Sequence, residues 1–310
     1  FQAALNAAPG SPERDFYHFK TSVGVPNNWQ SMFGGPAWTQ VPDGQWYLHL
    51  FDSSQPDLDW DNPRVQEEFE SILRFWLDRG VDGFRVDQPH AMGKAAGLPD
   101  HPDVERAGAG FIEGEPSPPM WFQESVHPIF RKWRAILDSY PGERAMCGEA
   151  YVLPLSFMAL WVRPDEFNQT FNFRFLDSEW KPDILRASIN ESFEAFDAVG
   201  APSTWVLSNH DIIRHASRMG GLTGRPTASN GIGPNDPQPD RELGYVGRER
   251  QPCLCLACRV QPTFTKVKNL DCLSTPPWLT NLDKTQLSTA LLASELVAMA
   301  AECRFRGSLA

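Results

Sequence analysis

Residues 81–87 read VDGFRVD, a short apolar run that ends in a carboxylate. Two later stretches have the same form: residues 144–149 read RAMCGE, and residues 203–211 read STWVLSNHD. Short apolar runs of this kind are typical of buried strands, so we expect one strand in each stretch. In a parallel barrel the carboxyl ends of the strands open onto one face. The three terminal acids are therefore expected to converge on one ligand.

A helical pattern precedes the first of these runs. Asn62 is a suitable N-cap, and Pro63 suits the first helical position. Apolar side chains then recur at positions 65, 69, 72 and 76, and Gly80 is a stop signal. The pattern predicts a helix over residues 62–80 that leads directly into the strand.

The same order of helix and strand recurs along the chain. Helices are expected over residues 126–140 and 182–199, before the second and third runs, and residues 170–175 are expected to add one more strand. This alternation predicts an α/β fold with a parallel sheet covered by helices. Residues 1–60 differ, because proline and glycine turn signals dominate there and only residues 46–51 indicate a strand.

Composition excludes several classes of protein. The chain has 310 residues, of which 41% are hydrophobic and 22% charged, as in globular domains. No apolar run approaches the roughly 18 residues of a membrane span, and no signal peptide is visible. The net charge of −11 argues against a nucleic-acid partner. Only Cys147 precedes residue 250, which favours a reducing, cytoplasmic compartment.

The surroundings of the three acids suit glycoside cleavage. That reaction needs a proton donor for the leaving oxygen and a carboxylate at the anomeric carbon, because its transition state resembles an oxocarbenium ion. Arg85 would keep Asp87 ionised, as a nucleophile requires. The apolar residues before Glu149 would raise its pKa and hold the proton of a general acid. Asp211, which follows His210, could hold sugar hydroxyls and stabilise positive charge.

A structural alternative exists for each of these residues. Strand-end acids also cap helices or pair with arginines, and for any single acid that is the commoner outcome. The presence of all three acids with their polar neighbours favours the catalytic interpretation. His18, His49 and His90 could reach such a site, and a structural role remains open for each of them.

Motifs around the acids resemble those of glycoside hydrolase family 13, the α-amylase family. The segments that carry the resemblance are Gly83–Asp87, Gly148–Glu149 and Asn209–Asp211. Gln55–Asp59 resembles the additional motif of the oligo-1,6-glucosidase and α-glucosidase branch of that family. Residues 26–38 are similar to the domain that this branch inserts after barrel strand three. The resemblance extends from residue 1 to about residue 250.

The resemblance implies a (β/α)8 barrel that retains the anomeric configuration through a covalent glucosyl-enzyme. Asp87 would be the nucleophile, Glu149 the acid/base and Asp211 the stabiliser of the transition state. In retaining enzymes the nucleophile and the acid lie about 5 to 5.5 Å apart. The residues expected to bind the substrate are Arg85, His90, Asn209, His210 and Arg214. No phosphate-binding glycine loop or metal-ligand cluster is apparent, and we expect no cofactor.

The chain departs from the family pattern in several places. Gln88-Pro89 stand where this branch usually has small or β-branched apolar residues that help to set linkage preference, so α-1,4 versus α-1,6 specificity stays open. Phe1–Leu5 resembles the segment just after barrel strand three, so strands one to three are expected to be absent. We expect an inserted domain over residues 1–60, a partial barrel of strands four to seven over residues 61–250, and a non-homologous tail over residues 251–310.

The tail differs in composition from the rest of the chain. Five of the six cysteines but only one of the 23 glycines follow residue 250. When the tail is back-translated and read one base early, only a few residues are possible at each position. Over residues 259–274 and 282–307 these possibilities include sequences that look like the missing family segments. We hypothesise that the reading frame slips shortly after Arg250 and that the tail is poorly ordered. The Cys253-x-Cys255-x-x-Cys258 spacing lacks a fourth ligand for a metal site.

These observations predict an α-glucosidase-like hydrolase that acts on maltose- or isomaltose-type oligosaccharides, present here as a truncated piece. A partial barrel exposes unpaired strand edges, so we expect an aggregation-prone product with little hydrolytic activity. One alternative is a transglucosylating or isomerising relative, such as a trehalose synthase or sucrose isomerase. Others are a gene remnant and a non-catalytic family member that binds sugar, although the presence of all three acids counts against the latter. The oligomeric state stays open.

Overall fold

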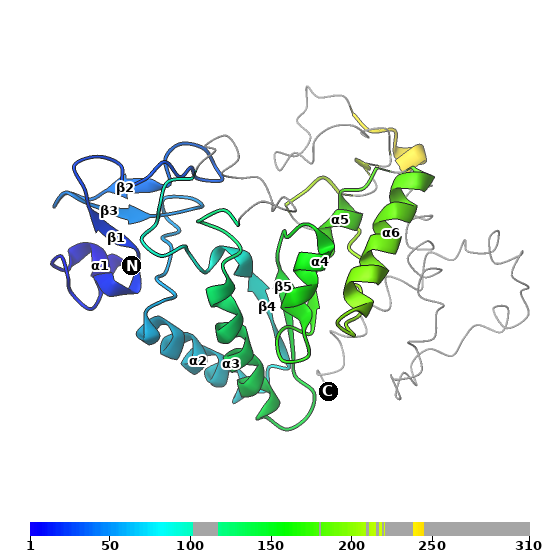
Figure 1. Ribbon diagram of the computed structural model, residues 1–310, viewed down its shortest axis with the longest axis horizontal. Helices are drawn as coiled ribbons and strands as arrows, with labels where there is room; N and C mark the ends of the chain where they lie inside the picture. Colours follow the sequence, from blue (N-terminus) through cyan, green and yellow to red (C-terminus); the bar gives the residue numbers. More distant parts are fainter. Residues whose placement is uncertain are drawn as a thin grey trace, which may run out of the picture. The chain divides into compact units, whose positions relative to one another are not determined.

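The structure, a computed structural model, describes only part of the chain (Figure 1). The described residues are 1–101, 117–179, 181–208, 211–214, 217–218, 220 and 238–244. They fall into two compact units. The first unit comprises Phe1–Asn172 and Glu191–Thr204, and the second comprises the described parts of Phe173–Asn190 and Trp205–Ala310. The tail after residue 250, with its cysteines and its hypothetical frame slip, lies outside the described residues, and the predicted division into three domains stays a prediction.

The elements of the described residues follow one another in this order: α1 (Gln2–Asn6), η1 (Arg14–Phe16), β1 (Phe19–Thr21), β2 (Trp38–Gln40), β3 (Gln45–Leu48), α2 (Pro63–Leu77), β4 (Gly83–Asp87), η2 (Pro89–Ala91), η4 (Glu124–Val126), α3 (His127–Asp138), β5 (Ala145–Glu149), α4 (Leu155–Met158), η5 (Ala159–Val162), β6 (Gln169–Thr170), α5 (Phe173–Leu176) and α6 (Pro182–Asp197). The helices expected before the three runs are therefore confirmed as α2, α3 and α6.

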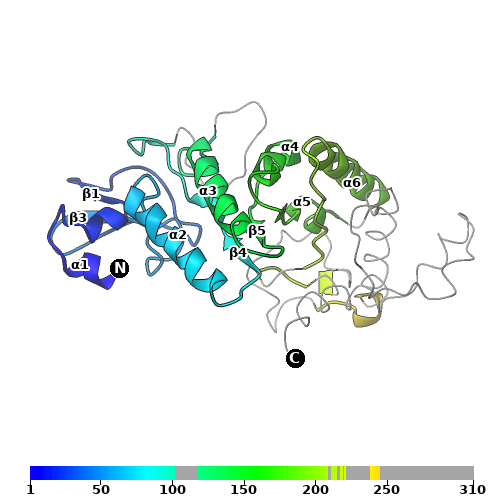
Figure 2. The same ribbon diagram turned by 90° about the horizontal axis from the view of Figure 1, so that it is seen from below.

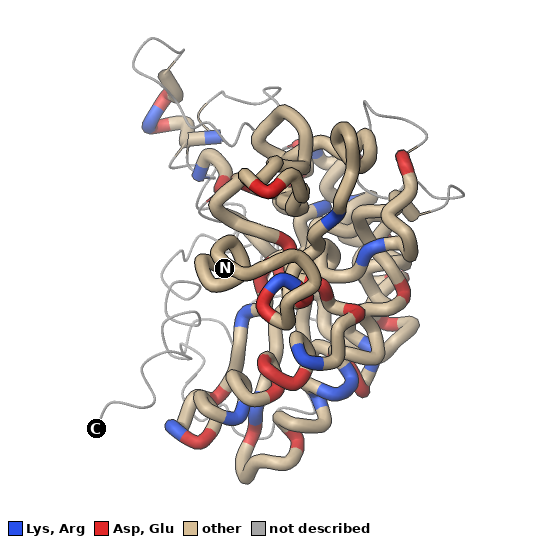
Figure 3. The backbone as a smooth tube through the Cα atoms, turned by 90° about the vertical axis from the view of Figure 1, so that its left-hand side faces the viewer, with Lys and Arg blue, Asp and Glu red and all other residues tan. Residues whose placement is uncertain are grey.

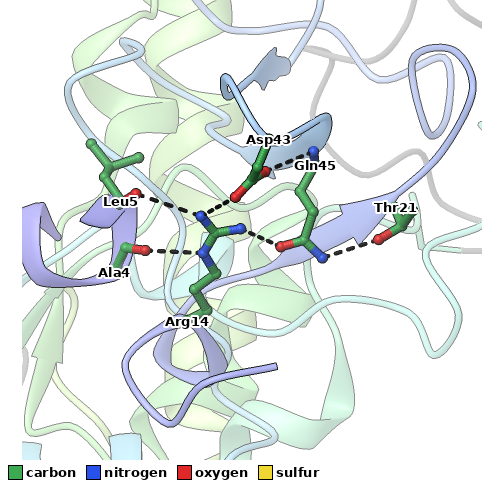
Figure 4. Close-up of polar contacts among 6 residues, drawn as sticks. All are labelled: Ala4, Leu5, Arg14, Thr21, Asp43 and Gln45. Atoms are coloured by element: carbon green, nitrogen blue, oxygen red, sulfur yellow. Dashed lines mark hydrogen bonds and ion pairs between the residues drawn. The ribbon is translucent and has the colours of Figure 1, made fainter. Parts of the chain in front are cut away.

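The N-terminal segment, residues 1–60, forms a small antiparallel sheet with the strand order β1-β3-β2. Strand β3 confirms the first half of the strand expected over residues 46–51, whereas β1 and β2 were not expected, because no pattern of apolar residues marks such short strands. A buried arginine, Arg14, joins this sheet to the segment before it (Figure 4). Its guanidinium donates to the backbone oxygens of Ala4 and Leu5 and to the side chains of Asp43 and Gln45. Because all these acceptors surround one planar cation, the charge is buried with its hydrogen bonds satisfied.

Helix α2 begins as the sequence predicts. The Asn62 side chain accepts a hydrogen bond from the backbone N–H of Arg64 at 3.0 Å, and Pro63 takes the first helical position. The buried face of the helix carries Val65, Leu73 and Leu77. Two members of the expected apolar stripe, Ile72 and Trp76, are exposed instead, because no described segment covers that side of the helix.

A second sheet, parallel and ordered β4-β5-β6, carries the two predicted strands that end in acids. Helices α2 and α3 lie side by side next to β4 and β5 (Figures 1 and 2). Helix α3 points Ile129, Trp133 and Ile136 into the core that also holds Met146 of β5. Among the described strands β4 has a neighbour on one side only, so this strand is half-exposed and not buried as expected.

The strand expected over residues 170–175 is mostly wrong. Strand β6 comprises only Gln169–Thr170, and Phe173–Leu176 form a helical turn in which the Asp177 N–H bonds to the Phe173 oxygen at 2.9 Å. Phe173, Phe175 and Leu176 are all buried. An apolar run of this length is compatible with a buried helix as well as with a strand, and the sequence does not distinguish the two.

The strand expected over residues 203–211 is also wrong for the part that the structure describes. Residues 203–208 form no strand, although the Asn172 N–H, two residues after β6, donates a hydrogen bond to the Thr204 oxygen at 3.2 Å. A strand needs a ladder of repeated pairs with a neighbour. Apolar composition alone does not provide one.

Charged residues are distributed over the described backbone without separation by sign. Figure 3 shows Lys and Arg positions interspersed with Asp and Glu positions. Among the helices that the structure describes, none combines the length and the apolar character needed to cross a bilayer.

Candidate active site

Asp87 and Glu149 end two neighbouring parallel strands. The register of the β4–β5 ladder pairs Gly83 with Ala145 and continues to the pair of Asp87 with Glu149. Residues paired in a ladder point to the same face of a sheet, and the Glu149 carboxyl is hydrogen-bonded to Asp87. The structure therefore brings two of the three predicted acids together at the carboxyl end of the parallel sheet.

Arg85 bridges the two acids. It lies two residues before Asp87 on β4, so both side chains occupy the same face of the strand. Its Nη1 lies 2.9 Å from Oδ1 of Asp87, and its Nη2 donates to Oε2 of Glu149. The planar fork of a guanidinium suits this simultaneous contact with two carboxylates. The predicted pairing of Arg85 with Asp87 is confirmed, and its contact with Glu149 was not foreseen.

The two acids differ in exposure and in the cost of ionisation. The Asp87 side chain is 70% exposed and that of Glu149 only 3%. Burial raises the pKa of Glu149 to about 7; the hydrogen bond and the charge of Asp87 add to the effect, while Arg85 opposes it. The sequence prediction that its apolar surroundings raise the pKa of Glu149 is confirmed. Near neutral pH this carboxyl group can therefore both donate and accept a proton.

Cys147 lies on β5 opposite Arg85 in the ladder. Burial raises the pKa of its thiol to about 11, although the Arg85 charge acts in the opposite direction. The thiol is protonated at neutral pH and is therefore a poor nucleophile. Its position in the buried strand fits a packing role.

The other predicted site residues fall in different places. His90 is buried in the first unit, in the turn after β4. Asp211 and Arg214 are exposed residues of the second unit. Asn209 and His210 lie outside the described residues. The predicted roles of these five residues in substrate binding or charge stabilisation stay predictions.

Of the two histidines in the N-terminal segment, His49 makes local side-chain contacts. One ring nitrogen of His49, Nε2, lies 2.9 Å from Oγ1 of Thr39, and the other, Nδ1, lies 2.9 Å from the backbone oxygen of Phe51. Burial lowers the pKa of His18 to about 3, helped by the charges of Lys94 and Lys20. The contacts of His49 fit the structural alternative.

A buried ion pair that the sequence did not predict attaches the N-terminal segment to the turn after Asp87. The Lys94 amino group lies 2.7 Å from Oδ1 of Asp57 and donates to the backbone oxygen of Ala91. Oδ2 of the same Asp57 accepts from the Leu50 N–H at 2.6 Å. The sequence did mark Asp57, because this residue belongs to the motif Gln55–Asp59. Nothing in the sequence indicated that Lys94 is the partner of Asp57.

A cavity of about 720 Å³ lies in the first unit, away from the two acids. Its walls include β1, the residues before α2 and the loop at Ala95–Leu98, and neither Asp87 nor Glu149 lines it. Among the described residues no group of three or more His, Cys, Asp or Glu side chains could hold a metal ion. The groups brought together at the ends of β4 and β5 are two carboxyl groups and a guanidinium.

Comparisons with known proteins find relatives of this chain. The family model described as "Alpha amylase, catalytic domain" matches residues 1–229. The alpha-glucosidase of Culex pipiens is 35% identical over 221 residues, which are 66% of this chain and 38% of that protein. The oligo-1,6-glucosidase of Heyndrickxia coagulans is 34% identical over 237 residues, or 69% of this chain and 41% of that protein. The chain thus spans about two fifths of the length of these relatives.

Solved structures of known enzymes are also similar to this chain. The alpha-glucosyl transfer enzyme XgtA superposes with a TM-score of 0.62 at 32% identity, covering 73% of this chain and 44% of that one. A trehalulose synthase, MutB, superposes with a TM-score of 0.55 at 29% identity, covering 68% of this chain and 39% of that one. Because the family model covers well over half of the residues, the chain belongs to the family of alpha-amylase catalytic domains.

Proposed function

We propose that the chain carries part of the active site of a retaining α-glucosidase that removes terminal glucose from maltose- or isomaltose-type oligosaccharides. The observation that carries the proposal is the pair of Asp87 and Glu149, bridged by Arg85, in which burial raises the pKa of Glu149 to about 7. One carboxylate that stays ionised and one carboxyl group that holds a proton are the two requirements of retaining glycoside cleavage.

In the first step an oxygen of Asp87 forms a bond to the anomeric carbon of the terminal glucose while the glycosidic bond breaks. The leaving oxygen takes the proton of Glu149, which becomes a carboxylate. The product is a glucosyl ester of Asp87. Arg85 contributes by holding the Asp87 carboxylate ionised and oriented, and Glu149 can deliver its proton because burial disfavours its charged form.

In the second step Glu149 acts as a base. Its carboxylate takes a proton from a water molecule, whose oxygen attacks the anomeric carbon and releases Asp87 as a carboxylate. Two successive displacements at the same carbon retain the configuration. If a sugar hydroxyl replaces the water, the same chemistry transfers glucose to that sugar.

The remaining site residues enter the proposal through their motifs. Asp211 is proposed as the stabiliser of positive charge in the transition state, and Asn209, His210 and Arg214 as residues that hold the sugar hydroxyls. The fold proposed for the complete site is a (β/α)8 barrel, to which this chain would contribute strands four to seven. The similarity to alpha-glucosidases supports the hydrolase, and the similarity to XgtA and trehalulose synthase supports glucosyl transfer as a second candidate.

Covalent trapping tests the proposal. The 310-residue chain is incubated with 5-fluoro-α-D-glucosyl fluoride, and its peptides are then analysed by mass spectrometry. Because such a reagent accumulates the intermediate, it suits a protein of low turnover. We expect a fluoroglucosyl adduct on the peptide that contains Asp87, and no adduct in Asp87→Asn. A parent chain that never acquires the adduct would overturn the proposed function.

Product analysis separates the two candidates. Maltose and isomaltose are supplied as substrates, and released glucose is compared with newly formed disaccharides and trisaccharides. Glucose as the main product supports hydrolysis, and a predominance of new glycosidic bonds supports transfer.

A further inference from the structure

The chain turns sharply directly after Asp87. Gln88 has a φ of +43°, a left-handed backbone conformation that a residue with a Cβ adopts at a cost. The turn continues as η2 (Pro89–Ala91), in which the Ala91 N–H bonds to the Gln88 oxygen at 2.9 Å. Contacts with neighbouring residues must stabilise this conformation, because the backbone alone does not favour it.

The aromatic packing of His90 anchors the turn. Its ring stacks against Trp121 with the centroids 5.4 Å apart and against Phe122 with the centroids 5.3 Å apart, at interplanar angles of 27° and 16°. The backbone oxygen of His90 accepts a hydrogen bond from the Phe122 N–H at 2.9 Å. Phe122 itself has a φ of +57°. His90 thus links the left-handed turn at Gln88 to the second left-handed residue, Phe122.

A substrate contact is a poor fit for this histidine. Only 6% of the residue is exposed, and its Nδ1 has no hydrogen-bond partner among the described residues. Burial, with the nearby charge of Lys94, lowers the pKa of His90 to about 3, so the ring is neutral at ordinary pH. A buried neutral ring that makes two stacking contacts acts mainly by packing.

We propose that His90 is a positioning residue, which holds the Asp87 carboxylate at the end of β4 by stacking on Trp121 and Phe122. The inference rests on the proposed function for the role of Asp87. Two residues separate His90 from Asp87, so loss of the stack would release the left-handed turn at Gln88 and let the end of β4 move. A displacement of about 1 Å at a reacting group can cost roughly 100-fold in rate.

Two variants of similar volume test the role of the ring. His90→Phe keeps an aromatic ring for stacking and removes both ring nitrogens, whereas His90→Leu removes the stacking and keeps apolar bulk. The first measurement is the labelling of Asp87 by 5-fluoro-α-D-glucosyl fluoride, followed over reagent concentration to separate the maximal rate from the half-saturating concentration. We expect His90→Leu to lose about 10- to 100-fold in maximal rate with little change in half-saturation, and His90→Phe to stay within about threefold of the parent in both.

Hydrogen–deuterium exchange provides a readout that does not depend on catalysis. We expect the peptide covering residues 84–92 to exchange faster in His90→Leu than in the parent, and His90→Phe to restore the protection. If His90→Leu leaves this exchange unchanged, the positioning role is wrong, whatever the chemistry of the parent.

The outcomes separate the two proposals. If His90→Phe raises the half-saturating concentration tenfold or more with its exchange unchanged, His90 binds substrate through a ring nitrogen and the inference is overturned. If His90→Leu is less stable but the folded protein is labelled at the parental rate, the role is only structural and the inference is likewise overturned. If the parent chain is never labelled, the proposed function fails, and the exchange measurement still decides whether His90 holds the turn.

Discussion

Two stretches of the chain with the same sequence pattern have different local structures. Within residues 81–87, residues 83–87 pair with residues 145–149 over five register positions and bring Asp87 to Glu149. Residues 203–208 form no strand in the described part of the chain. Apolar runs that end in acids thus mark candidate strands, but the neighbouring strand decides whether the acid at the end is held in place.

The largest effect is expected from a change in the stretch that forms the ladder. Asp87→Asn removes the proposed nucleophile, and we expect the rate of labelling by 5-fluoro-α-D-glucosyl fluoride to fall by at least about 1,000-fold, because no covalent intermediate can form. The change keeps the size of the side chain and its proximity to Arg85. Unaltered circular dichroism would serve as the control for folding, and labelling activity within tenfold of the parent would contradict the assignment.

The second prediction concerns the other stretch, residues 203–211. Asp211→Asn is expected to lower the same activity by about 100-fold, because a carboxylate that faces developing positive charge stabilises the transition state by a few kcal/mol. The covalent adduct on Asp87 should still form, although more slowly. Should Asp211→Asn react at the parental rate, the stretch 203–211 carries no catalytic acid and the two stretches differ in function as well as in structure.

The ladder itself is tested at Gly83, where β4 meets β5. A Cβ built on Gly83 would lie 2.4 Å from the backbone oxygen of Ala145, which is a steric clash. We expect Gly83→Ala to lower the free energy of unfolding by about 1–3 kcal/mol, measured in urea, because one strand must move away from the other. Gly24→Ala is the matched control, since a Cβ there meets nothing within 4 Å.

The fourth prediction is a dependence of stability on pH. The pKa of Glu149 in the folded chain, about 7, lies above its ordinary value of 4.5. The folded state therefore favours the protonated carboxyl, and the stability that this provides is present below pH 4.5 and is lost as the pH rises through 7. Relative to Glu149→Gln, the parent should become less stable between pH 5 and pH 8. A difference between the two proteins that is constant with pH would contradict the raised pKa.

Much of the fold could be predicted where local signals and packing agree. Helix α2 has its N-cap at Asn62 and its proline at Pro63, so its start follows from the sequence. The short apolar runs before Asp87 and Glu149 likewise predicted the two parallel strands. Residues 173–176 could not be assigned, because an apolar run of that length fits a buried helical turn as well as a strand.

The site was predictable in its residue types but not in its contacts. The pairing of Arg85 with Asp87 follows from the alternation of side chains along one strand. The contact of Arg85 with Glu149 depends on the register between two strands that are distant in sequence. The ion pair of Lys94 with Asp57 depends on how the N-terminal segment folds back. Tertiary packing sets both contacts, and no local pattern encodes them.

The pKa of Glu149 tests the central claim most directly. The carboxyl group can be followed by ¹³C NMR of the chain labelled at the glutamate side chains, with Glu149→Gln to assign the signal. We expect an apparent pKa near 7 that falls in Asp87→Ala, because the hydrogen bond and charge of Asp87 both raise it and Arg85 is then left to pair with Glu149. A pKa near 4.5 that does not respond to the loss of Asp87 would contradict a shared site at the ends of β4 and β5.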